Sequence, residues 1–146
     1  MRIELLSAGQ GVTSEAFYFF DIDKEALNQV YAYGDQLRIN DKVFTQNENS
    51  LNSTETIVDN LTCNDFIFID PYYPFDESHG ATYVDIFMKA VKKNVPAMLW
   101  YGYRTIQEKQ NMQQKFEEYF NTYEINKNES HIFGIEIILS LIQNKD

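Results

Sequence analysis

The stretch Asp65-Phe66-Ile67-Phe68-Ile69-Asp70-Pro71-Tyr72-Tyr73 decides the fold that the sequence predicts. Residues 66–69 form an unbroken run of aromatic and β-branched side chains, which is typical of a strand buried on both faces. Pro71 ends this strand because proline has no backbone N–H to give to a sheet. The strand therefore carries an acid, a proline and two tyrosines to one edge of the sheet.

Strands and helices alternate on both sides of this stretch. Apolar runs predict other strands over residues 2–6, 16–22, 37–45, 95–101 and 132–142, and helical spacing predicts helices over residues 24–33, 81–93 and 105–121, with a short helix that ends at Leu61. Such alternation is typical of an α/β three-layer sandwich around a largely parallel sheet. We expect one domain over residues 1–146.

Polar residues and a glycine predict where two of these helices begin and end. Asp23 is a good N-cap for the helix over residues 24–33, and Gly34 is expected to close that helix. Ser53 or Thr54 can cap the short helix that ends at Leu61.

Composition excludes several classes of protein. The chain has 146 residues, of which 15% are aromatic, and this argues for one packed core and against disorder. No apolar run approaches the ~18 residues of a membrane helix. Cys63 is the single cysteine and cannot form an internal disulfide, so we expect a cytoplasmic protein. His79 and His131 lie far apart, so we expect no metal site.

The formal net charge of −10 works against binding to nucleic acid, whose phosphates an acidic chain repels. A role on nucleic acid therefore needs a local basic patch or a partner that supplies one. The one concentration of basic residues in the sequence is an RNA-facing patch or a solvated helix face; it consists of Lys89, Lys92, Lys93, Arg104 and Lys109.

Three segments lie at the expected carboxyl ends of strands, where parallel sheets bind their ligands. They are Asp21-Ile22-Asp23, the region of Asn47, and Asp70-Pro71-Tyr72-Tyr73. Each also has a plainer interpretation: an acid after a strand can cap the next helix, and Asp-Pro is a common way to stop a strand.

The quartet Asp70-Pro71-Tyr72-Tyr73 resembles the Asp-Pro-Pro-Tyr signature of methyltransferases that modify the exocyclic amine of adenine. The whole stretch over residues 19–141 resembles the 23S ribosomal RNA adenine methyltransferases of the RlmJ type. In that family an acid ends an earlier strand, as Asp21 does here. A later strand has a Leu-Trp-Tyr core, here Met98-Leu99-Trp100-Tyr101, and another has an Ile-Glu-Leu-like pattern, here Gly134-Ile135-Glu136-Ile137-Ile138-Leu139.

The resemblance implies a Rossmann-like class I methyltransferase fold, with S-adenosylmethionine as the methyl donor and adenine in RNA or DNA as the substrate. It also implies that Asp70 and Pro71 hold the amine and that Tyr73 stacks on the base. Asp21 or Asp23 would bind the ribose hydroxyls of the donor.

The resemblance places Asn47 or Glu48 near the adenine of the donor. In place of the family's glycine-rich donor loop, the sequence offers only a compressed loop containing Gly9 and Gly11, which can equally be a plain turn.

The sequence departs from the family in two ways. Tyr72 replaces the second proline and is expected to fill part of the base pocket, and the chain is shorter than family members at both ends. Two alternatives follow. The site is completed by a second copy of this chain or by a partner chain, or the protein is an inactive relative. Such a relative would serve as a protein-binding or assembly module through exposed Tyr72, Tyr101 and Tyr103.

Overall fold

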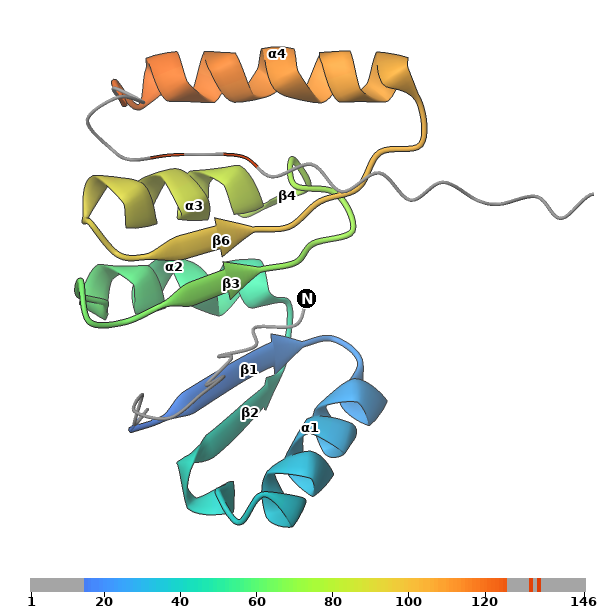
Figure 1. The fold of residues 1–146 in the computed structure, drawn as a ribbon, viewed down its shortest axis with the longest axis vertical. Helices are drawn as coiled ribbons and strands as arrows, with labels where there is room; N and C mark the ends of the chain where they lie inside the picture. The colour runs from blue at the N-terminus through green and yellow to red at the C-terminus, as the bar shows by residue number, and fades with distance from the viewer. Residues whose placement is uncertain (1–14, 126–131, 133, 135–146) are drawn as a thin grey trace, which may run out of the picture.

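The computed structural model describes residues 15–125, Ile132 and Gly134, and within them the protein is a mixed α/β structure with parallel strands. Strand β1 (Phe17–Asp21) pairs in parallel with β2 (Val43–Asn47). Strand β3 (Ile67–Ile69) pairs in parallel with β6 (Ala97–Leu99). Figure 1 shows that the arrows of β1 and β3 point to the same side, so both strands end at the same edge. The predicted α/β class with parallel strands is confirmed.

Within the described residues four helices lie between and after these strands, and each begins at a polar side chain that caps its first turn. Their bounds are α1 Lys24–Gln36, α2 Ser50–Asn60, α3 Tyr83–Lys92 and α4 Ile106–Thr122. A hairpin of β4 (Glu77–Ser78) and β5 (Ala81–Thr82) precedes α3, and a short 3₁₀ turn, η1 (Asn40–Lys42), precedes β2.

The predicted caps of the first two helices are partly wrong. Asp23 caps α1 as expected, because its side chain accepts the N–H groups of Glu25 and Ala26. Helix α2 begins earlier than predicted, at Ser50, because Asn49 is its cap. Thr54 lies inside α2 and is buried.

Gly34 does not close α1 but lies inside it, buried against β2. A Cβ atom at this position would come within 3.0 Å of Val43 Cγ2, so the bare glycine lets the helix approach the strand. The helix ends after it, where Arg38 takes a φ of 58°. The chain then turns through η1, so the strand predicted from residue 37 begins only at residue 43.

Helices α2 and α3 cover one face of β3 and β6 and form the core with it. The most deeply buried side chains of this layer include Val58 from α2, Ile69 from β3 and Ile86 from α3, which are at most 1% exposed. This burial fixes which face of β3 points inward, since neighbouring residues of a strand point to opposite faces.

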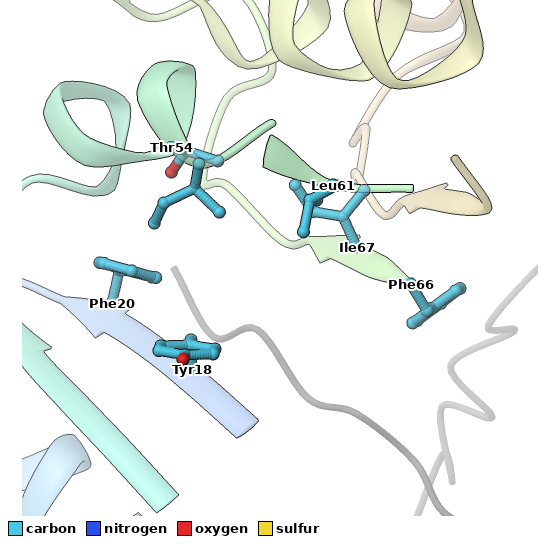
Figure 2. A pocket seen from close by; sticks show the side chains of 7 residues that line it. Tyr18, Phe20, Thr54, Leu61, Phe66 and Ile67 are labelled. Atoms are coloured by element: carbon cyan, nitrogen blue, oxygen red, sulfur yellow. The ribbon is translucent and has the colours of Figure 1, made fainter. Parts of the chain in front are cut away.

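Helix α1 and helix α2 lie against opposite faces of β1. Phe17 pairs with Val43, which packs on Gly34 of α1. Tyr18 and Phe20 alternate with these positions, and both line a small cavity together with side chains from α2 and β3 (Figure 2). The strands predicted over residues 16–22, 37–45, 66–69 and 95–101 are all shorter in the structure. Those expected over residues 2–6 and 132–142 lie outside the described residues, apart from Ile132 and Gly134.

Candidate functional site

A pocket of about 220 Å³ lies where β1 and β3 end, and it joins two of the three segments that the sequence singled out. Its lining residues come from the turn after β1, the start of α2, the loop after β3 and the start of α3: Asp21, Ile22, Asn49, Ser50, Pro71, Tyr72, Asp76 and Tyr83. Because β1 and β3 run in the same direction, Asp21 and Pro71 meet at this edge although they are distant in sequence.

Asp21 is half-buried at the end of β1, and hydrogen bonds hold the turn that follows it. Its Oδ1 accepts the N–H of Asp23 at 2.8 Å. The Asn47 side-chain amide donates to the carbonyl oxygens of Asp21 and of Ile22, both at 2.9 Å. Asn47 therefore fixes the backbone of the turn that presents Asp21, while its predicted contact with a donor adenine stays a prediction.

The residues of the loop after β3 differ in whether they line the pocket. Asp70 is half-buried and Pro71 is buried, and Pro71 lines the pocket while Asp70 does not. Tyr72 also lines the pocket, yet it is 90% exposed. A side chain so open to solvent does not fill the cavity, contrary to the expectation for this residue.

Tyr73 is half-buried and turned toward α4. Its hydroxyl accepts a hydrogen bond from Lys115 Nζ at 3.1 Å, and its ring meets Phe75 edge-on at 5.5 Å between centroids. Phe75 in turn packs on Phe116 and Tyr119 of α4. These contacts tie Tyr73 to an aromatic cluster, and it is not among the residues that line the pocket.

Four lining residues were not predicted from the sequence as site residues. Asn49 caps α2 through the N–H of Leu51, and an asparagine before an apolar-periodic segment is a signal that could have indicated it. Ser50 and Tyr83 lie with their hydroxyl oxygens 3.4 Å apart. The contact joins α2 to α3, and no local pattern in the sequence predicts it; nor does one predict Asp76.

The charged side chains that line the pocket, Asp21 and Asp76, are both acidic. Several of the lysines expected to form a basic patch interact with their own chain instead. Lys93 donates to the carbonyl oxygens of Val58 and Asp59 at the end of α2. Lys92 lies over the ring of Tyr123, and Lys109 over the ring of Tyr103. Their engagement favours the helix-face interpretation over the RNA-facing one.

A second, smaller cavity of about 50 Å³ lies between β1, α2 and β3 (Figure 2). Its walls are mostly apolar and include Phe20, Leu61 and Ile67. The Thr54 hydroxyl donates to the carbonyl oxygen of Ser50. The cavity is thus a packing gap between elements and offers no chemistry of its own.

Gly9 and Gly11 of the predicted donor loop lie outside the residues that the structure describes. Within the described residues no group of histidine, cysteine and acidic side chains is arranged to hold a metal ion. The helices found there are too short or too polar to cross a membrane.

Comparison with protein-family models, with curated proteins and with solved structures found no match for this chain. Any assignment of function therefore rests on the residues and the geometry given above.

Proposed function

We propose that the protein is a methyltransferase that uses S-adenosylmethionine and acts on the exocyclic amine of adenine in RNA or DNA. The observation that carries the proposal is that Asp21, at the end of β1, and Pro71, after β3, line one and the same pocket. The proposal includes a Rossmann-like three-layer fold. The parallel strand pairs and the helices on both faces of β1 support it.

Adenine's exocyclic amine needs help from the protein because its lone pair is delocalised into the ring. A carboxylate and a neighbouring carbonyl can accept both amine hydrogens, which favours a pyramidal nitrogen with an available lone pair. Asp70 and Pro71 are adjacent at the end of β3 and carry those two acceptor types. S-adenosylmethionine, when bound, supplies an electrophilic methyl group.

The described part of the pocket fits part of the donor. Two adjacent ribose hydroxyls suit a carboxylate acceptor, and Asp21 lines the pocket with its turn held by Asn47. A volume of about 220 Å³ lies below the ~300–1,000 Å³ of common small-molecule sites, so these residues match a base or a ribose and not the whole donor. Asp21 is the residue that would hold the ribose.

Calorimetry with S-adenosylhomocysteine and a methyl-transfer assay on total RNA and DNA test the proposal. We expect saturable binding that Asp21→Ala weakens, and methyl transfer that Asp70→Ala abolishes while the fold and the donor affinity persist. Asp59→Ala is the matched control, because it removes an exposed acid at the other end of α2. Absence of donor binding at millimolar ligand, or transfer that persists in Asp70→Ala, would contradict the proposal.

A second candidate function is an inactive relative that serves as a binding or assembly module. The outer face of β3 and β6 favours it: Met98 and Trp100 are 45% and 43% exposed, and Met98 pairs with Phe68 on the face turned away from the core. The tyrosines first expected to make such a surface do so only in part, because Tyr101 and Tyr103 are half-buried. If the protein fails to bind the donor, sedimentation of wild type and of the Trp100→Gln variant tests this candidate in place of the enzyme.

A further inference from the structure

Tyr72 and Tyr73 are neighbours in sequence but have opposite environments. Tyr72 is 90% exposed and lines the pocket at the ends of β1 and β3. Tyr73 is half-buried and does not line it. An aromatic ring left almost wholly in water has a face available for stacking on a ligand, and Tyr72 presents that ring beside a pocket.

The contacts of Tyr73 prevent it from serving a ligand in this pocket without rearrangement. To turn its ring toward the pocket, the residue would have to break its hydrogen bond with Lys115 and leave the edge of Phe75. It would also leave the Lys115 ammonium, which lies 5.5 Å from its ring centroid. Tyr72 needs no such change, because solvent occupies the space around it.

Resting on the proposed function, we infer that Tyr72, and not Tyr73, is the residue on which the adenine base stacks. Tyr72 lines the pocket and directly follows Pro71, whose own ring restricts its backbone and whose side chain is buried. A base that stacks on Tyr72 would cover the most exposed large apolar side chain among those described. The tyrosine that replaces the signature's second proline thus takes the stacking role, and Tyr73 anchors the loop to α4.

A titration with 9-methyladenine, in which two-dimensional NMR of the labelled protein measures binding, tests this assignment. The probe has a methyl group in place of ribose, so a ribose contact at Asp21 contributes nothing to its binding. Each titration is run with and without saturating S-adenosylhomocysteine, which occupies the donor site if the proposed function holds. The variants are Tyr72→Ala, Tyr72→Phe and the matched Tyr73→Phe, which keeps the ring but loses the bond to Lys115.

We expect Tyr72→Ala to weaken binding of 9-methyladenine roughly 5- to 150-fold, the range that base–aromatic stacking corresponds to. Tyr72→Phe should retain most of the affinity, because the ring and not the hydroxyl stacks, and Tyr73→Phe should leave it unchanged. Unchanged binding in Tyr72→Ala, or no binding of the base to wild type, overturns the inference. If S-adenosylhomocysteine still binds in that case, the proposed function survives; if it also fails to bind, both fall.

Discussion

At the scale of single residues, the side-chain amide of Asn47 fixes the turn that follows β1. Its two N–H bonds go to the carbonyl oxygens of Asp21 and Ile22. The resemblance to adenine methyltransferases suggested a different role, in which residue 47 stands where an acid contacts the donor. The two roles predict opposite consequences for a change from amide to carboxylate.

We expect Asn47→Asp to lower the free energy of unfolding by about 1–2 kcal/mol, because two carbonyl oxygens lose their donors and then face a carboxylate. Urea denaturation measures the change. Gln46→Glu is the control, since it introduces the same charge difference at the preceding exposed position of β2. A variant as stable as wild type that binds S-adenosylhomocysteine more tightly would instead support the acid-like role.

The sequence predicts part of the pocket because strand ends of a parallel arrangement share an edge. Asp21 and Pro71 follow from that rule alone. The difference between Tyr72 and Tyr73 does not, because it depends on where α4 lies and on the contact of Tyr73 with Lys115. Local patterns carry no information on such a long-range contact.

At the scale of the elements, the sequence predicts both ends of α3 and α4 to within two residues, whereas it misplaces the start of α2 and the end of α1. Capping boxes join Thr82 to Asp85 and Thr105 to Glu108, and both pairs have the three-residue spacing that is typical of this motif. Gly34 misleads because a glycine can end a helix or admit a close neighbour, and only its contact with Val43 distinguishes the two. The end of α1 therefore depends on packing that the local sequence does not reveal.

The two capping threonines should differ in their effect on stability. Thr82 is 7% exposed and its hydroxyl lies 3.2 Å from the Tyr119 hydroxyl of α4, whereas Thr105 is exposed. Loss of a cap costs about 0.5–2 kcal/mol, so we expect Thr82→Ala near the upper end of that range and Thr105→Ala near the lower. Thermal and urea unfolding of both variants measure this. Equal losses would mean that the contact with Tyr119 adds nothing to the cap.

At the scale of the whole molecule, the two parallel strand pairs meet through side chains and not through a hydrogen-bonded ladder between the described strands. Phe20 from β1 and Ile67 from β3 are 2% and 3% exposed and line the same small cavity (Figure 2). The site depends on this junction, because Asp21 directly follows Phe20 in the chain, and Pro71 follows β3.

Removing Phe20 should therefore destabilise both halves of the described structure at once, that is, β1 and β2 with α1, and β3 and β6 with α3. We expect Phe20→Ala to lower the free energy of unfolding by about 3–5 kcal/mol, as a large cavity in a packed core does. Tyr18→Ala is the matched control on the same strand and face. Tyr18 is 49% exposed and stacks on Phe44, so its loss should cost only about 0.5–1.5 kcal/mol.

Native-state amide exchange gives the decisive measurement, because α1 and α3 belong to different halves. If Phe20 couples the halves, protection falls in both helices together; a fall confined to α1 would show that the strand pairs open independently and that the pocket between them is not held by this contact.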